Sequence, residues 1–190
     1  MPPKAKVSKE DIVNAAVEIV RTSGAEALNA RTVAAKLDCS TQPVFSNFAS
    51  MEQLRLAVVE QADRLCDSYI AREVEQGRYP AYKASGIAYI RFAKEEKELF
   101  KLLYMRDRTG EQFPTQMEIS PRMMPIVQGA TGMQDEKMRL FHLEMWACVH
   151  GIATMFATGF LDMDWTLVSA MLTDFYQGMR KVKEQNNECD

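Results

Sequence analysis

The amino-acid sequence predicts an all-α protein, with a three-helix N-terminal head followed by a larger C-terminal helical bundle. Apolar residues recur at helical spacing along most of the chain. Glycines and prolines interrupt this pattern at intervals that fit ordinary helix lengths. No stretch shows a strand pattern, and no segment is repeated. These observations favour helices packed on helices.

Charge is distributed unevenly along the chain. Of 190 residues, 47% are hydrophobic and 26% are charged, which is typical of a soluble protein able to bury a sizeable core. The net charge of −3 argues against wholesale coating of nucleic acid. Residues 1–50 have a net charge of +1, however, and the remaining residues have −4. Any DNA contact is therefore expected to be local, near Lys4, Lys6 and Lys9.

Cysteine spacing and hydropathy bear on the compartment. Four cysteines are widely separated and include no C-x-x-C pair, which favours a reducing compartment over a disulfide framework. No apolar run approaches the ~20 residues that span a bilayer, and no apolar signal segment follows the basic N-terminus. We therefore expect a cytoplasmic protein without membrane contact.

The sequence contains clear signals for the start of the first two helices and for the end of the first. Residues 1–7 contain two prolines and are expected to form a mobile arm. Ser8 and Asp11 form a capping-box pattern for a helix to about Ser23, which Gly24 would end. Asn29 is a suitable cap for a second, short helix. Apolar stripes fall at Ile12, Ala16 and Ile19 in the first helix and at Val33, Ala34 and Leu37 in the second.

The stretch from Ser40 to Phe48 predicts a third, very short helix. Ser40 is expected to cap it, and Pro43 falls in the first turn, where no backbone N–H is needed. The expected apolar side consists of Val44, Phe45 and Phe48, and the polar side consists of Thr41, Gln42, Ser46 and Asn47. Short polar side chains that donate and accept hydrogen bonds suit the reading of base edges in the major groove. Three helices joined by short turns describe a helix-turn-helix unit, although a surface helix of any bundle would also be polar outside.

The rest of the chain is predicted to form longer helices separated by breaks. Residues 51–76 predict one helix of ~26 residues, about 39 Å long, which can leave the small domain and enter the next. Residues 106–117 are expected to form a loop, and the prolines and glycines of residues 121–132 allow only short helices. Further helices are expected at about residues 80–93, 95–105, 135–158 and 165–183.

Residues 8 to about 56 resemble the N-terminal domain of the tetracycline-repressor-like (TetR) family of transcription regulators. The spacing fits without gaps and is more specific than a generic helix-turn-helix. The matching residues are Ile12, Ala15, Ala16, Gly24, Val33, Ala34, Leu37, Ser40, Phe45, Phe48, Glu52 and Leu54. Residues 87–100 and the element from Trp146 to His150 and Gly151 resemble one class of TetR effector domain, with its Trp-x-x-x-His-Gly pattern.

Four positions depart from the pattern of the family. Asp38 stands where the family usually has Gly, and Asp tolerates a left-handed turn. Phe45 and Met51 replace a Tyr and a Lys that commonly contact phosphates, so both contacts are expected to be lost. Asn47 replaces a frequent His and can still donate a hydrogen bond. We expect weaker and less salt-dependent DNA binding, partly restored by the basic arm.

The last two long helices are apolar around much of their circumference, so they must be covered. One candidate cover is the core of the monomer. The other is a four-helix bundle with a second copy, which the resemblance implies, and we expect both covers on different faces. Two heads about 34 Å apart would read successive major grooves of one duplex.

Thirteen methionines favour an adaptable apolar cavity in the second domain, although core packing explains any single one of them. The expected ligand-binding residues are Phe92, Tyr104, Met105, Met117, Met124, Phe141, Met145 and Trp146.

Metal binding and catalysis find little support in the sequence. His142, Glu144 and Cys148 do not share one helix face, and their spacing is not a metal motif. His150 is expected to pack or hydrogen-bond inside the bundle. No nucleophile–base pair is convincingly placed, and no phosphate-binding loop is present. We therefore expect no metal, no cofactor and no enzymatic activity.

The sequence thus predicts a DNA-binding domain at residues 1–50 and a ligand-binding and dimerisation domain at residues 51–190. The expected partners are an operator in double-stranded DNA, a small-molecule effector that releases the protein from it, and a second copy bound through the last two helices. The expected DNA-binding residues are Lys4, Lys6, Asn29, Arg31, Ser40, Thr41, Gln42, Pro43, Phe45, Ser46 and Asn47. Two other classes stay open: a ligand-binding protein whose head has lost specific DNA binding, and a small helical enzyme.

Overall fold

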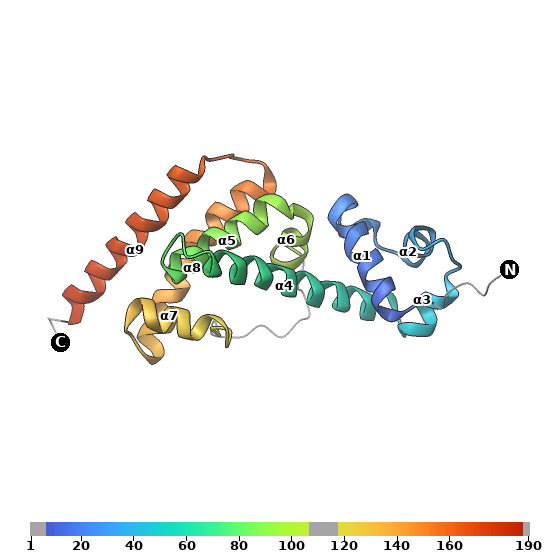
Figure 1. Cartoon of the computed structure of the whole chain (residues 1–190), viewed down its shortest axis with the longest axis horizontal. Helices are drawn as coiled ribbons and strands as arrows, with labels where there is room; N and C mark the ends of the chain where they lie inside the picture. The colour runs from blue at the N-terminus through green and yellow to red at the C-terminus, as the bar shows by residue number, and fades with distance from the viewer. Residues whose placement is uncertain (1–6, 107–117, 188–190) are drawn as a thin grey trace. The chain divides into compact units, whose positions relative to one another are not determined.

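The computed structural model describes residues 7–106 and 118–187, and the regular structure of these residues is helical throughout. The helices are α1 (Lys9–Ser23), α2 (Ala30–Lys36), α3 (Gln42–Asn47), α4 (Met51–Glu75), α5 (Ala81–Glu95), α6 (Lys97–Tyr104), α7 (Met123–Thr131), α8 (Asp135–Thr158) and α9 (Trp165–Asn187) (Figure 1). The all-α prediction is confirmed. Most of the expected arm and loop, at residues 1–6 and 107–117, lies outside the described residues.

The described residues divide into two compact units. Unit 1 contains residues 7–67 and 96–106, and unit 2 contains residues 68–95 and 118–187. Helix α4 is continuous and contributes its first part to unit 1 and its last part to unit 2. The chain then returns to unit 1 for α6. The expected boundary at residue 50 separates two functions, DNA binding and ligand binding, whereas the two units are defined by their internal contacts. The functional boundary therefore stays a prediction.

Helix α1 begins with the expected capping box. The backbone N–H of Asp11 donates to Ser8 Oγ (3.0 Å), and the backbone N–H of Ser8 donates to the Asp11 carboxylate (2.9 Å). Hydrogen bonds from the Ser8 hydroxyl and then from its backbone N–H hold the pKa of Asp11 below its usual range. Gly24 ends the helix at φ +80°, a left-handed angle that glycine adopts without strain.

Helix α2 is capped by Asn29 as expected. Its Oδ1 accepts from the backbone N–H groups of Arg31 (3.0 Å) and Thr32 (3.1 Å). Its Nδ2 donates to the carbonyl of Ala27 (3.3 Å), so both polar atoms of the side chain are used locally. Asp38 then turns the chain at φ +48°, which confirms that it takes the left-handed role usually given to glycine.

Helix α3 starts later than the sequence predicts, and no side chain caps it. The expectation that Ser40 caps it is wrong, because the residue before the helix is Thr41, whose backbone angles are already helical (φ −73°, ψ −12°). A capping side chain folds back onto the first turn from an extended residue at that position. Pro43 does lie in the first turn, as predicted.

The core of unit 1 fixes which side of α3 faces outward. Val44 and Phe48 are 1% and 2% exposed, whereas Phe45 is 54% exposed. The prediction that Phe45 shares the apolar side is therefore wrong: residue 45 is one position, or about 100°, away from residue 44. The same core contains Ile12, Ala16, Val20, Leu28, Val33, Ala34, Leu54, Val58, Leu99 and Phe100.

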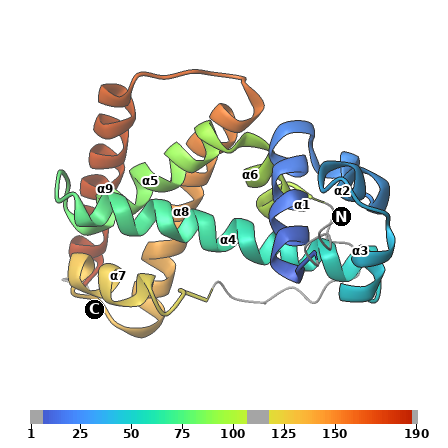
Figure 2. The same ribbon diagram turned by 45° about the vertical axis from the view of Figure 1, so that its right-hand side comes forward.

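Unit 2 is built on the packing of α5 along α8 (Figure 2). Two tyrosines of α5 hydrogen-bond two histidines of α8. The Tyr82 hydroxyl lies 2.9 Å from His142 Nδ1, and the Tyr89 hydroxyl lies 2.9 Å from His150 Nδ1. The pairs are about two helical turns apart, so they join the helices at two levels. The expectation that His150 hydrogen-bonds inside the bundle is confirmed.

Helix α8 has the bounds that the sequence predicts, and α9 continues beyond the expected end at about residue 183. Among the described residues, α8 alone is long and apolar enough to cross a membrane by length and composition. This corrects the expectation that no apolar run approaches that length. Of the most apolar 18-residue window of α8, 44% is buried inside the protein.

Replacing Asn29 by alanine is expected to lower the free energy of unfolding by about 1 kcal/mol, because the first turn of α2 loses its cap. Urea unfolding of Asn29→Ala and Asn29→Ser measures this difference. The serine variant should retain most of the stability, since its hydroxyl can also cap. Equal stability of the alanine variant and the parent would contradict the assigned role.

Acidification is expected to weaken the protein through its two histidines, because burial lowers the pKa of both His142 and His150. The unfolded chain then binds more protons as the pH falls through the ordinary histidine range. The stability is therefore present above this range and is lost below it. The free energy of unfolding in urea should fall between about pH 7.5 and about pH 5.5. The double variant His142→Gln, His150→Gln should show a smaller fall than the parent, and an equal fall would refute this origin.

Candidate functional site

The outward face of α3 is the candidate nucleic-acid interface. Gln42, Phe45 and Ser46 are exposed, and Thr41 and Asn47 are half-buried. Residues three and four apart lie on the same side of a helix, so Thr41, Gln42, Phe45 and Ser46 form one stripe. The structure thus brings together four of the predicted DNA-binding residues on one face of a helix.

Two side chains of α3 are partly used within the helix. Ser46 Oγ donates to the carbonyl of Gln42 (2.9 Å), and Asn47 Nδ2 donates to the carbonyl of Pro43 (2.8 Å). Each group keeps acceptor capacity on its oxygen, and the amide of Asn47 keeps one further N–H. In this conformation, the amide side chain of Gln42 therefore offers more hydrogen-bond donors and acceptors to a ligand than any other side chain of the stripe.

The residues expected to contact phosphates lie at the start of α2 and in the N-terminal arm. Arg31 is exposed at the start of α2, but the side chain of Asn29 is engaged as the cap of that helix. Lys4 and Lys6 lie outside the described residues. Lys9 is the first residue of α1, and its ammonium lies 5.1 Å from the centroid of the Phe48 ring. The start of α1 is thus adjacent to the end of α3.

Two of the expected ligand-binding residues belong to unit 1. The ring of Tyr104 packs on Phe100, with 5.0 Å between centroids, and its side chain hydrogen-bonds Cys66. Burial raises the pKa of the Cys66 thiol to about 12, against the effect of that hydrogen bond. Met105, which follows α6, is exposed. Tyr104 and Met105 therefore belong to a different unit from the other expected ligand residues that the structure describes.

The expected ligand residues of unit 2 occupy several places in its core. Phe92 is buried and meets Tyr69 of α4 edge-on, with 5.5 Å between ring centroids. Met124 packs against a small cluster formed by Ile119, Val127 and Met138. Trp146 is half-buried and stacks on His150 at 4.6 Å. Phe141 and Met145 are buried on α8, and Met117 lies outside the described residues.

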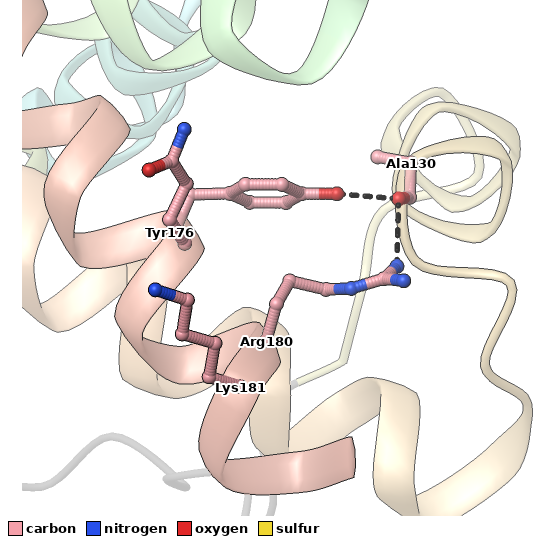
Figure 3. Close-up of a pocket in the computed structure, with 5 residues that line it drawn as sticks. Ala130, Tyr176, Arg180 and Lys181 are labelled. Atoms are coloured by element: carbon pink, nitrogen blue, oxygen red, sulfur yellow. Dashed lines mark hydrogen bonds between the residues drawn. The ribbon is translucent and has the colours of Figure 1, made fainter.

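An open pocket of about 470 Å³ lies in unit 2 where α7 ends beside α9 (Figure 3). The hydroxyl of Tyr176 donates to the carbonyl of Ala130 (2.6 Å), and Arg180 Nη1 donates to the carbonyl of Thr131 (2.9 Å). Figure 3 shows Lys181 beside Arg180, both reaching from α9. The residues that line the pocket are Ala130, Tyr176, Gln177, Arg180 and Lys181.

None of these lining residues was predicted to bind a ligand. The sequence favours α9 as an apolar packing helix, and its basic residues follow the apolar stripe without a distinctive motif. The one available signal was the spacing of Tyr176 and Arg180, which places an aromatic and a cation on one helix face. Only the fold shows that α7 ends against that face.

An aromatic cluster joins this pocket to the core of unit 2. The ring of Tyr176 packs edge-on against Phe141 (5.7 Å between centroids) and against Tyr82 (6.2 Å). Burial raises the pKa of the Tyr82 hydroxyl, and the neighbouring Tyr176 raises it further. The hydroxyl therefore stays neutral and bonded to His142. The pocket wall is thus continuous with Phe141, one of the expected ligand residues.

Metal ligands do not gather in the part of the chain that the structure describes: no three His, Cys, Asp or Glu side chains converge there. His142 and Cys148 are residue types that bind metals, but the structure gives each of them an environment that does not favour metal binding. His142 pairs with Tyr82, and burial raises the pKa of the Cys148 thiol, which disfavours the thiolate that would bind a metal.

Comparisons with known proteins support the sequence resemblance. The model of the tetracyclin repressor-like C-terminal domain matches residues 82–175, about half of the chain. No curated protein sequence matches the chain.

Solved structures share the fold over most of the chain. A TetR-like transcriptional regulator from Rhodococcus sp. RHA1 aligns with a TM-score of 0.62 at 12% identity, covering 93% of this chain and 96% of that one. A TetR family member from Streptomyces coelicolor A3 aligns at 0.58 and 17% identity, covering 88% and 96%. The multidrug-binding protein EbrR, in complex with imidazole, aligns at 0.57 and 18% identity, covering 88% of each chain.

The domain match covers most of α5, all of α6, α7 and α8, and the first half of α9, and the shared fold extends the likeness to the head with α3. The protein belongs to the tetracycline-repressor-like (TetR) family of transcriptional regulators.

Proposed function

We propose that the protein is a repressor that binds an operator in double-stranded DNA and leaves it when a small molecule binds unit 2. The main support is the outward stripe of α3, where uncharged polar side chains flank an exposed phenylalanine. A helix presenting such side chains fits the major groove, which displays a distinct pattern for each base pair. A cytoplasmic location follows from this role.

The proposed division of labour on DNA separates base reading from positioning. Thr41, Gln42, Ser46 and Asn47 would read or approach base edges, with Ser40 and Pro43 at the entrance of the helix. Arg31 and the arm residues Lys4 and Lys6 would contact phosphates. Asn29 would contribute through the position of α2, since its side chain is engaged in the cap.

A homodimer through α8 and α9 would place two heads on one duplex. Five large apolar side chains on these helices are exposed: Leu140, Leu143, Leu167, Phe175 and Val182. Leu140 and Leu143 are three residues apart and share a helix face, which suits packing against a second copy. The dimer is required because half-sites one helical turn apart need two reading helices.

The proposed effector is an apolar or amphipathic molecule that enters at the pocket beside Tyr176 and reaches Phe141. Tyr176 and Phe141 offer an apolar wall, and Lys181 offers positive charge at the mouth, where the guanidinium of Arg180 is engaged with Glu184 (3.0 Å) and the carbonyl of Thr131. An effector with an anionic or strongly accepting group would match this charge. The solved relative EbrR is a multidrug-binding protein, which is in keeping with an apolar effector. Met124, Met145 and Trp146 would adapt to the molecule from the surrounding core.

Helix α4 would carry the signal, because it is the helix that connects the head to the effector unit. Its last turns are firmly held in unit 2. The hydroxyl of Tyr69 donates to the carboxylate of Glu95 on α5 (3.0 Å), and Tyr69 packs on Phe92. Glu73 is buried and pairs with Arg78 (2.8 Å) and Arg91 (3.7 Å). A shift of α5 on ligand binding would therefore move α4 and change the spacing of the two heads.

Operator binding tests the DNA half of this proposal. A binding selection from randomised duplexes at low salt should recover a palindromic operator for the wild-type protein. Gln42→Ala should bind that operator at least about fivefold more weakly, because a base-edge contact contributes about 1–3 kcal/mol of discrimination. Fluorescence anisotropy measures the affinity, and sedimentation and thermal unfolding confirm an intact dimer.

Gln76→Ala is the matched control, since the same substitution is made at an exposed residue of unit 2. It should bind like the parent. Recovery of no enriched duplex, together with ligand binding by unit 2, would instead favour a ligand-binding protein without specific DNA recognition. The absence of the usual tyrosine and lysine at Phe45 and Met51 motivates that alternative.

Probe binding tests the ligand half. The amphipathic probe 1-anilinonaphthalene-8-sulfonate has apolar rings and one negative charge, so it should bind at the pocket. Lys181→Gln should weaken binding about fivefold, because one attraction at close range in water is worth about 1 kcal/mol. Fluorescence titration measures the affinity, with Lys36→Gln, an exposed lysine on α2, as the control. Equal affinities in both variants would show that the probe binds elsewhere.

A further inference from the structure

Phe45 lies at the centre of the outward stripe of α3, and the residue is 54% exposed. It is three residues from Gln42 and four from Thr41, so the three side chains lie on one helix side. No other large apolar side chain is exposed on α3. Val44 and Phe48 already serve the core, so packing within unit 1 does not account for the exposed ring.

The hydrogen bonds within α3 make the Phe45 ring a larger share of what the stripe can offer to a ligand, because they engage two of its polar neighbours. The hydroxyl proton of Ser46 is directed to the carbonyl of Gln42, and the amide of Asn47 donates to the carbonyl of Pro43. The stripe is thus less rich in free donors than its composition implies. A phenyl ring has no hydrogen-bonding group, so it cannot bind a phosphate oxygen or the polar edge of a base.

The major groove offers one apolar feature that distinguishes base pairs, the 5-methyl group of thymine. We infer that Phe45 is a specificity-determining residue whose ring packs against a thymine methyl group in each half of the operator. This inference rests on the proposed DNA binding and adds the identity of one base that the head selects. Gln42 on the same stripe supplies the neighbouring polar contact.

The chemistry predicts a preference that base substitution can measure. Replacing thymine by deoxyuridine removes only the methyl group and leaves base pairing unchanged. The wild-type protein should lose about fourfold in affinity for each half-site when the contacted thymine is replaced, as expected for one buried methyl group. Substitution at other thymines should have no effect.

The experiment scans the selected operator with one deoxyuridine at a time, against wild-type protein, Phe45→Ala and Leu56→Ala, by fluorescence anisotropy. Leu56 is the control because this residue is 56% exposed and lies on α4 instead of α3. Phe45→Ala should bind the thymine and uracil duplexes equally, whereas Leu56→Ala should discriminate like the parent. The wild-type scan requires no mutation, so it tests the inference even if the alanine variant is unstable.

Two results would overturn the inference while leaving the proposed function intact. One is wild-type binding to the operator that no deoxyuridine weakens. The other is unchanged discrimination in Phe45→Ala. Failure of the wild-type protein to select any duplex would instead overturn the proposed function, and this inference with it.

Discussion

The direction in which α3 faces depends on the burial of Val44 and Phe48 in the core of unit 1. A six-residue helix is far too short to be stable alone, so its position comes from packing rather than from its own backbone bonds. These two side chains are four residues apart and form one buried stripe. Once they are buried, Gln42, Phe45 and Ser46 must face outward. The candidate interface is therefore a direct consequence of the core.

The supporting helices reinforce this constraint from both ends. α1 and α2 begin with side-chain caps, and α3 has none, so its two neighbours provide the rigidity that it lacks. Lys9 of α1 lies over the ring of Phe48, which joins the start of the first helix to the residue that ends the third. α6 returns from unit 2 to complete the same core with Leu99 and Phe100.

Unit 2 relies on partly buried polar pairs as well as apolar packing. The Tyr82–His142 and Tyr89–His150 hydrogen bonds fix the register of α5 on α8, because sliding either helix would break both of these partly buried bonds. Tyr176 extends the first pair into an aromatic cluster that reaches the pocket wall. The same helix α5 holds the end of α4 through Tyr69 and Glu73. Helix α5 thus contributes both to the packing beside the pocket and to the position of the end of α4.

Local signals determined much of this protein in advance. Capping residues, glycine stops and apolar spacing closely located both ends of α1, α4 and α8 and the start of α2, because those signals act within a few residues of the chain. They also identified α3 and most of its polar face. They failed for Ser40 and Phe45, since the start of α3 and its rotation are set by what Val44 and Phe48 meet in the core.

Only the tertiary structure decided where distant side chains meet. Composition drew attention to methionines, but Tyr104 and Met105 belong to a different unit from Phe141 and Met145. The pocket is formed by the end of α7 against Tyr176 and Arg180, about fifty residues away in the chain. Periodicity describes the face of one helix and carries no information about its partner. The sequence by itself therefore determined the helices and most of the polar residues on the outward stripe of α3, whereas packing decided the rotation of α3, the pocket and the residues that surround it.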